Sequence, residues 1–264
     1  MDALATSGGS LALMYHALSA DGCAVAGQDP HYTLPADGFQ KQLDACASHG
    51  RPVVSARDWL AGPRRPATLL SFDDGHISNY ELAFPLLIAR DAGADFFINS
   101  ATVGRAGYCG WQQLREMADA GMSIQSHSHE HTYLTSYDAA TLRAELTRSR
   151  KLIEDAIGKP VTLLAPPGGR MPANLADVAR GCGYEHILSS KPGLVKSAAA
   201  FVLPRMAVTA KLDMATLNAW LRGDILTFAK ARLRYAVLAG MKRLLGDDGY
   251  ERLRREAVRG SGKY

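Results

Sequence analysis

The sequence predicts an α/β protein in which parallel strands alternate with helices. Short apolar segments typical of buried strands fall near residues 10–15, 67–72, 95–98, 123–126, 162–165 and 186–189. Patterns typical of amphipathic helices separate them near residues 37–48, 79–92, 111–120, 138–157 and 173–181. Strands that are regularly separated by helices indicate parallel strands in a barrel or a doubly wound sheet.

Capping signals mark the ends of several predicted helices. Asn and Asp side chains accept hydrogen bonds from the first backbone N–H groups of a helix, a role predicted for Asn79 and Asp138. Glycine readily adopts the left-handed conformation that ends many helices, a role predicted for Gly93, Gly121 and Gly158.

Two adjacent carboxylates end one predicted strand. The segment Ser71–Gly75 reads Ser-Phe-Asp-Asp-Gly and closes the apolar run Ala67–Leu70. An ionised carboxyl is costly to remove from water unless it is paired, hydrogen-bonded or bound to a metal. Asp73 and Asp74 also repel one another, so neither can neutralise its neighbour. The pair therefore indicates a nearby cation.

A histidine cluster after another predicted strand supplies nitrogen ligands for such a cation. Ser126–His131 reads Ser-His-Ser-His-Glu-His and follows the apolar stretch 122–125. Residues i and i+4 share one face of a helical turn, so we expect His127 and His131 to converge and His129 to point elsewhere. Two imidazoles and one carboxylate, with one position open to water, are typical of a catalytic zinc site.

These segments resemble the motifs of the polysaccharide deacetylases, carbohydrate esterase family 4 with the NodB-homology fold. Ser71–Gly75 resembles the T/S-F-D-D-G motif, and Ser126–Leu134 resembles S-H-[ST]-x-x-H-x-x-L. Leu164–Gly169 resembles the R-x-P-x-G segment, and the three occur in the family's order within a resemblance that covers about Ala12–Pro204. The resemblance implies an irregular, incomplete (β/α) barrel of the NodB-homology type with a helical C-terminal extension.

The resemblance also implies roles for the polar residues at the strand ends. Asp73 would be the general base, while Asp74, His127 and His131 would bind one divalent metal ion. Zinc is the first expectation for this ligand set, and cobalt or nickel are alternatives. The expected substrate is an N-acetylated saccharide.

The third motif matches the family only in part. Pro167 and Gly169 occupy its fixed positions, and a backbone N–H near Gly168 is expected to stabilise the oxyanion. The arginine that begins this motif in many members, and steadies the catalytic base, is Ala165 here. Arg170 could replace it, or could be a solvated loop arginine.

A histidine near the N-terminus is the candidate general acid. The family's late Leu-x-His motif, whose histidine protonates the leaving amine, has no counterpart, because the last histidine of the chain is His186. Leu11–His16 is an apolar run that ends in a histidine. It resembles the Y-H segment of the permuted subgroup that deacetylates poly-β-1,6-N-acetylglucosamine, which implies that His16 is the acid. The alternative is a histidine satisfied by the surroundings of its strand.

The expected function is metal-dependent removal of N-acetyl groups from amino sugars of a polysaccharide, or of its oligosaccharide or lipid-linked precursor, in exopolysaccharide biosynthesis. One alternative is a deacylase or deformylase of a different lipid-linked sugar amide. A second is a carbohydrate-binding member of the fold that has lost catalysis, suggested by Ala165 and the absent late histidine. A third is an unrelated metal-binding protein, which the three ordered motifs disfavour.

The positive charge of the chain is concentrated at its C-terminal end. Residues 219–264 contain 11 Lys and Arg and 5 Asp and Glu, so their net charge is +6, whereas the whole chain carries +4. We expect a deacetylase domain over residues 1–214 and a basic helical extension over residues 215–264. In residues 225–245, apolar residues and cations alternate at helical spacing, which suits packing on the barrel or contact with an anionic membrane surface. No aromatic platform or groove-reading motif accompanies the cations, so we expect no nucleic-acid partner.

Cysteine usage and the N-terminal segment predict a reducing compartment. The four cysteines form no C-x-x-C pair, so free thiols are expected at Cys23, Cys46, Cys109 and Cys182. Met1–Gly9 carries no basic segment before the first apolar run, so we expect no signal peptide. We therefore expect cytoplasmic residence, with peripheral contact to the inner membrane surface as an option.

Overall fold

The computed structural model of the chain describes residues 9–20 and 28–241. The prediction for Cys23 and the part of the predicted extension beyond residue 241 lie outside the described residues. The strands are β1 (Ser10–Tyr15), β2 (Ala17–Ser19), β3 (Thr33–Pro35), β4 (Val53–Val54), β5 (Thr68–Phe72), β6 (Asp95–Ile98), β7 (Ser123–Ser126), β8 (Leu163–Leu164), β9 (His186–Leu188), β10 (Leu194–Val195), β11 (Val202–Leu203) and β12 (Met206–Ala207). The helices are α1 (Ala36–Ser48), α2 (Ala56–Ala61), α3 (Phe84–Ile88), α4 (Trp111–Asp119), α5 (Ala139–Ile157), α6 (Leu175–Gly181) and α7 (Met214–Leu221).

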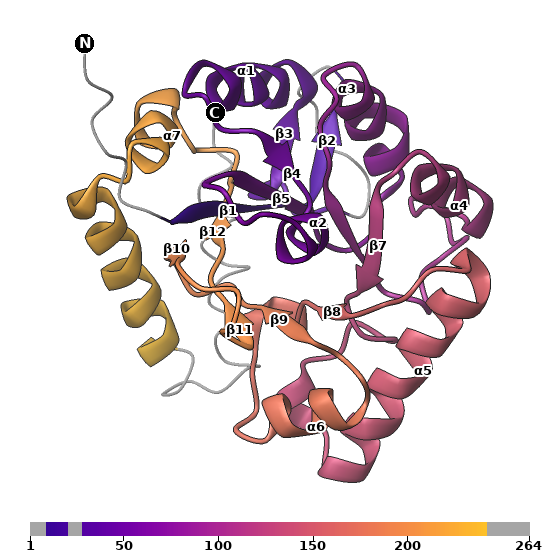
Figure 1. The fold of residues 1–264 in the computed structure, drawn as a ribbon. Coiled ribbons are helices and arrows are strands. Elements are labelled where there is room, and N and C mark those ends of the chain that lie inside the picture. The colour runs from indigo at the N-terminus through magenta and orange to yellow at the C-terminus, as the bar shows by residue number, and fades with distance from the viewer. Residues whose placement is uncertain (1–8, 21–27, 242–264) are drawn as a thin grey trace, which may run out of the picture.

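The strands form a nearly closed, barrel-like sheet surrounded by helices (Figure 1). Its order is β10-β1-β5-β6-β7-β8-β9-β11, and every neighbouring pair from β1 to β11 is parallel. The chain then passes from β11, beside β9, to β12, which pairs with β1. Pro204 and Arg205 therefore lie in the segment that joins the two ends of the sheet. The predicted irregular (β/α) barrel is confirmed.

The strand register brings the polar segments together. Tyr15 of β1 lies opposite Phe72 of β5, and the backbone N–H of Asp73 donates to the Tyr15 carbonyl at 2.9 Å. Ile98 of β6 lies opposite Ser126 of β7, which in turn lies opposite Leu164 of β8. Because these strands are parallel, the residues that follow them meet at one end of the barrel, where (β/α) barrels place their active sites.

Aromatic packing beneath this end explains why β1, β5 and β6 are buried strands. The Phe72 ring stacks on Phe96 at 5.2 Å between centroids, and Tyr15 contacts both Phe39 of α1 and Phe72. The Tyr15 hydroxyl donates to the Gln42 side chain at 2.7 Å, so its polar end is satisfied inside the core. The ends of these strands, and the polar residues that follow them, are therefore held in place by the packed core.

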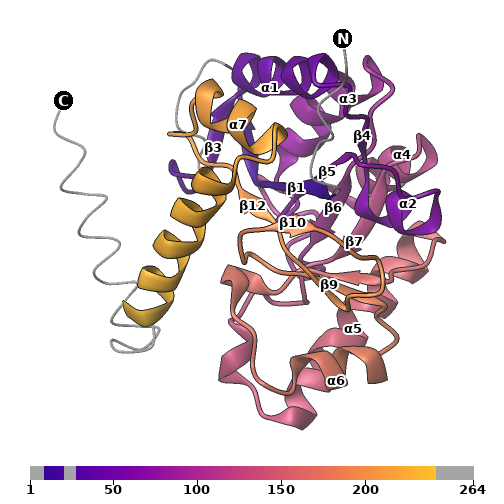
Figure 2. The same ribbon diagram turned by 60° about the vertical axis from the view of Figure 1, so that its left-hand side comes forward.

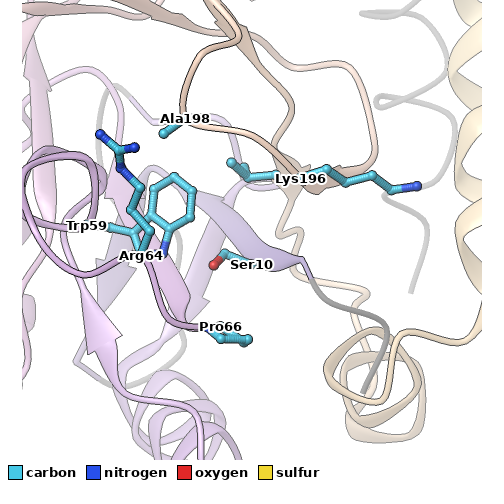
Figure 3. A pocket seen from close by; sticks show the side chains of 7 residues that line it. Ser10, Trp59, Arg64, Pro66, Lys196 and Ala198 are labelled. Carbon is cyan, nitrogen blue, oxygen red and sulfur yellow. The ribbon is translucent and has the colours of Figure 1, made fainter. Parts of the chain in front are cut away.

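A pocket opens at the other end of the same strands, where β1 and β5 begin (Figure 3). Its lining residues are Ser10, Trp59, Arg64, Pro66, Val195, Lys196 and Ala198. The amine of Lys196 extends away from the Trp59 ring (Figure 3). This pocket is separated by the length of the strands from the residues that follow Tyr15 and Phe72.

The helices follow the prediction closely, with two corrections at their ends. Asp138 caps α5 through its contact with the Thr141 N–H at 2.8 Å, as predicted. Asn79 is not an N-cap: it begins a π-helical turn, η1 (Asn79–Ala83), and its side chain donates to the His16 carbonyl at 2.7 Å. Gly93 does not have the predicted left-handed conformation. A side chain at this position would press against backbone atoms of Val54 and Ser55.

The C-terminal part begins with α7, which packs on the barrel beside α1. Leu217, Trp220 and Leu221 are buried, and the Leu221 carbonyl accepts from the buried Arg51 guanidinium at 3.0 Å. A further helix over residues 225–241 runs along one side of the molecule (Figure 2). None of the helices in the described residues is both long and apolar enough to cross a membrane.

Candidate metal centre and active site

Asp74, His127 and His131 converge at the carboxyl ends of β5 and β7. Asp74 Oδ1 lies 3.3 Å from His127 Nε2 and 3.1 Å from His131 Nε2. One donor atom from each residue falls within 4.8 Å of the other two. In the described part of the chain, this is the one group of three His, Cys, Asp or Glu side chains that converges in this way. The sequence therefore identified the three residues that meet.

The histidines converge by a route that differs from the predicted helical turn. Residues 127–131 form an irregular loop, and Ser128 and His131 have positive φ angles of 66° and 58°. These left-handed residues turn the chain so that both imidazoles face Asp74. His129 points elsewhere, as expected, because its Nδ1 contacts the Ser100 hydroxyl at 2.8 Å. The prediction of a helical turn was wrong. The side chains of His127 and His131 nevertheless converge, and that of His129 points elsewhere, as predicted.

Helix α5 holds this loop through two residues one turn apart. Glu145 Oε1 accepts the backbone N–H groups of His129 and Glu130 at 2.9 and 2.7 Å. The Ser149 hydroxyl, which is fully buried, contacts the Ser128 carbonyl at 2.9 Å. Left-handed non-glycine residues are strained, so they persist only where surrounding contacts fix them. Glu145 and Ser149 provide that fixation, and neither was singled out from the sequence.

A backbone carbonyl fixes the orientation of the buried ligand His127. His127 Nδ1 donates to the Ala165 carbonyl at 2.7 Å. A carbonyl can only accept, so Nδ1 carries a proton, and Nε2 is the ring nitrogen that faces Asp74. Histidines that ligate metals are usually oriented by such an outer partner. Ala165, at the position where an arginine was expected, therefore contributes through its main chain.

Asp74 is directed into the cluster by its own backbone. It has φ of 76°, and Gly75 after it has φ of 70°. A side chain at Gly75 would place its first carbon 2.9 Å from Ile98 Cδ1. The Asp-Gly pair thus allows a tight turn directly after β5, which a bulkier residue at position 75 would prevent.

Asp73 turns away from this cluster and pairs with Arg205. The guanidinium donates to both carboxylate oxygens, at 2.7 and 2.8 Å, and also contacts the Ser71 hydroxyl at 3.1 Å. Arg205 is fully buried. Burial raises the pKa of Asp73, but the Arg205 guanidinium, with smaller contributions from His127 and His16, outweighs that effect, and the pKa lies below its usual value. Asp73 is therefore a buried carboxylate kept ionised by an arginine.

Arg205 fills the role that the sequence left open between Ala165 and Arg170. The Arg170 guanidinium lies over the Tyr133 ring, 4.7 Å from its centroid, while both oxygens of Asp73 face Arg205. Sequence reasoning missed Arg205. A single charged residue between the short apolar strands β11 and β12 was the signal that could have identified it.

His16 follows β1 and lies beside the two carboxylates. Its ring stacks on Tyr32 with 4.4 Å between centroids, and its Nδ1 is buried without a hydrogen-bond partner. Burial lowers the pKa of His16, and the nearby Asp74 and Asp73 oppose that shift. A smaller share of the imidazole is then protonated at neutral pH, and the protonated share is the stronger acid. The unpaired, buried ring nitrogen fits a group that acts on a bound molecule.

The third motif forms a tight turn, η3 (Pro167–Gly169), directly after β8. Gly168 has φ of 60°, and an added Cβ there would collide with the Tyr133 ring. The Ala165 carbonyl that contacts His127 precedes this turn, so Pro167 and Gly168 border the candidate site. Their predicted part in stabilising an oxyanion stays a prediction.

The charges of the converging residues suit a cation. Burial raises the pKa of Asp74, but its contacts with His127 and His131 outweigh that effect and hold the pKa well below its usual value. Burial lowers the pKa of His131, but Asp74 outweighs it and raises that pKa. Asp74 Oδ1 is buried and makes no contact with hydrogen-bond geometry, although two imidazole nitrogens lie near it. A carboxylate oxygen and two imidazole nitrogens that face one point fit a divalent ion.

The fold and the site together define an α/β-barrel protein with a candidate catalytic metal centre at the carboxyl ends of its strands. Residues 61–187 match the sequence profile of the family named Polysaccharide deacetylase. The chain is 24% identical over 216 residues to YxkH of Bacillus subtilis, whose name describes it as a polysaccharide deacetylase. The aligned region covers 79% of this chain and 75% of YxkH. It is 22% identical over 200 residues to the Staphylococcus aureus poly-beta-1,6-N-acetyl-D-glucosamine N-deacetylase, with 68% and 69% covered.

A solved structure shares the fold. The deacetylase PplD of Streptococcus pyogenes, in complex with acetate, superposes with a TM-score of 0.70 at 22% identity, covering 78% of this chain and 94% of that chain. The chain therefore contains a polysaccharide deacetylase domain of the NodB type. Members of this family are hydrolases, and the resemblance inferred from the three motifs is confirmed.

We expect purified protein to bind about one divalent ion, and Asp74→Ala, His127→Ala and His131→Ala each to abolish that binding, because a three-ligand site loses its affinity with two ligands. Calorimetric titration with zinc measures the loss directly. His129→Ala is the control, since its ring contacts Ser100 instead. Loss of binding in His129→Ala with retention in His131→Ala would overturn the assignment.

Weakening the contact to Asp73 should move the pH dependence of activity. Arg205 lowers the pKa of Asp73 against the effect of burial, so its removal should raise that pKa. The acid limb of kcat/KM should then shift to higher pH, modestly in Arg205→Lys and further in Arg205→Gln. An acid limb that stays in place while activity falls would mean that Arg205 supports only the fold.

Proposed function

We propose that the protein is a metal-dependent hydrolase that removes N-acetyl groups from amino sugars of a polysaccharide or of its oligosaccharide or lipid-linked precursor. The observation that carries this proposal is the division of labour between two adjacent carboxylates. Asp73 pairs with Arg205 through both oxygens, while Asp74 faces two imidazoles. One carboxylate is thus available as a base, and the other as a ligand.

Asp74, His127 and His131 are the residues proposed to hold the ion, with zinc as the first candidate and cobalt or nickel as alternatives. When bound there, a divalent ion supplies Lewis-acid chemistry: it lowers the pKa of water and polarises a carbonyl. His127 is buried and oriented by the Ala165 carbonyl, whereas the His131 side chain is 44% exposed, so the cluster is more open on the His131 side. The more exposed side is where a saccharide can approach.

Asp73 is proposed to accept the proton of the attacking water. Its contact with Arg205 keeps it ionised at neutral pH and fixes the direction of its oxygens. A base must be positioned before its basicity matters, and a bidentate arginine provides that positioning. A backbone N–H near Gly168 is proposed to stabilise the developing oxyanion. Arg170 is proposed to contact the saccharide at the rim.

His16 is proposed to protonate the departing amine, which cannot leave as an anion at neutral pH. Its buried, unpaired Nδ1 and its position beside Asp73 support this role. His16 and Arg205 also weaken the alternative of an inactive carbohydrate-binding protein. They are candidates for the roles of the late histidine and the motif arginine that the sequence lacks. The Staphylococcus aureus relative acts on poly-β-1,6-N-acetylglucosamine, by its name, which makes that glycan the first substrate to test.

Release of acetate together with free amine tests the proposed activity. Purified protein with added zinc, cobalt or nickel should deacetylate at least one of a panel of β-1,6-linked and β-1,4-linked N-acetylglucosamine oligomers and lipid-linked precursors. Asp73→Asn should retain bound metal and lower turnover by roughly 10²–10⁴-fold, because an amide cannot accept the proton. Binding of an oligomer without acetate release from any of the panel would favour the inactive binding protein.

His16→Ala should separate amide from ester substrates. Loss of a general acid should slow hydrolysis of the acetamide by roughly 10²–10⁴-fold. An aryl acetate should be much less affected, since a phenolate leaves without protonation, and bound zinc should be unchanged. Equal losses on both substrates would make His16 a structural residue, with His76 or His129 as the next candidates for the acid.

A further inference from the structure

The helix over residues 225–241 is basic and contains no acidic residue. Its cations are Lys230, Arg232 and Arg234. Asp224 precedes it and caps its start, accepting from the Thr227 N–H at 2.8 Å. The helix therefore has an N-terminal cap, and all its charged side chains are positive.

Two faces of this helix have different surroundings. Phe228 is buried at 5% exposed, and Arg232 Nε donates to the Pro192 carbonyl at 3.3 Å, so this face lies on the barrel. On the other face Leu226, Leu233 and Val237 are 71%, 68% and 54% exposed. Spacings of seven and four residues align the three in one stripe along the helix.

The exposed stripe is unusual for this protein. Seven large apolar side chains are exposed in the described residues, and four belong to this helix: the three of the stripe and Ile225, which is 82% exposed but lies outside the stripe. The other three are Ile88, Leu152 and Val202, which lie on separate elements. Contiguous exposed apolar surface commonly marks an interaction site.

Cations accompany the stripe on the same side of the helix. Lys230 lies four residues after Leu226 and three before Leu233, so it shares their face, and Arg234 is four residues further on. An apolar stripe bordered by Lys and Arg, with no acidic residue, is typical of helices that lie in the surface of an anionic bilayer. An apolar protein groove would have no need of the cations, and a second copy of this basic helix would repel the first.

The helix also lies near the mouth of the candidate active site. Pro192, its contact, belongs to the loop after β9, and Ser190 in the same loop packs against Gly169 of the third motif. Burial lowers the pKa of His31, and the positive charge of Arg234 lowers it further, so Arg234 lies close to His31. His31 precedes Tyr32, and the Tyr32 ring stacks on His16. Figure 2 shows the helix running along one side of the barrel.

We propose that residues 225–241 dock on the surface of an anionic phospholipid bilayer, with Leu226, Leu233 and Val237 among the acyl chains and Lys230 and Arg234 against the headgroups. The helix lies in the plane of the membrane and does not cross it. Because it borders the loops around Tyr32 and Ser190, docking brings the active-site mouth close to the headgroup surface. Saccharides attached to the membrane then meet the site at high local concentration.

Sedimentation with vesicles tests the docking, using the full chain. We expect binding to vesicles of phosphatidylcholine mixed with phosphatidylglycerol, and much weaker binding to phosphatidylcholine alone or at high salt. Lys230→Gln should lower the partition coefficient about fivefold, since each cation near the surface contributes separately. Leu233→Asp should lower it by about tenfold or more, because it places a charge within the apolar stripe.

Matched controls separate the helix from general effects of charge. Leu152→Asp and Lys151→Gln make the same changes on the exposed surface of α5 and should leave vesicle binding unchanged. Acetate release from a soluble oligomer should be the same in Lys230→Gln and Leu233→Asp as in wild type, so failure of the docking is distinguishable from failure of the proposed function. Equal binding to neutral and anionic vesicles, unaltered binding by both helix variants, or a dimer that Leu233→Asp dissociates would each overturn the proposal.

Discussion

Two like charges at the end of one buried strand are the constraint on which the site depends. Asp73 and Asp74 both follow β5 and cannot neutralise one another, so the fold must supply each with its own partners. Asp73 receives a buried arginine, and Asp74 receives two imidazoles. The difference in partners gives the two carboxylates different chemistry, because one is kept ionised by the protein itself while the other faces donor atoms suited to a cation.

Closure of the barrel provides the first of these partners. The segment from β11 to β12 joins the two ends of the sheet, and Arg205 in that segment reaches Asp73, which follows the interior strand β5. Removing one member of a buried ion pair costs about 3–5 kcal/mol, because the other charge remains without a partner. The same contact therefore links the stability of the closed sheet to the position of the proposed base.

The sequence predicted most strands and helices, because apolar periodicity and capping residues act locally. It also predicted that Asp74, His127 and His131 meet, since parallel strands bring their carboxyl ends together. It did not predict Arg205, whose contact with Asp73 spans 132 residues and depends on how the sheet closes. Nor did it predict the irregular loop that orients the histidines, because the left-handed Ser128 and His131 are held by contacts from α5, a long-range effect that no local pattern encodes.

The most direct test of this account is a zinc titration of chelator-treated protein, with acetate and free amine measured on an N-acetylglucosamine oligomer. The account predicts no release before metal is added, and recovery that saturates near about one equivalent of zinc. Asp74→Ala, under the same conditions, should recover nothing. Full release from the metal-free protein, or recovery in Asp74→Ala equal to wild type, would contradict the division of roles between Asp73 and Asp74.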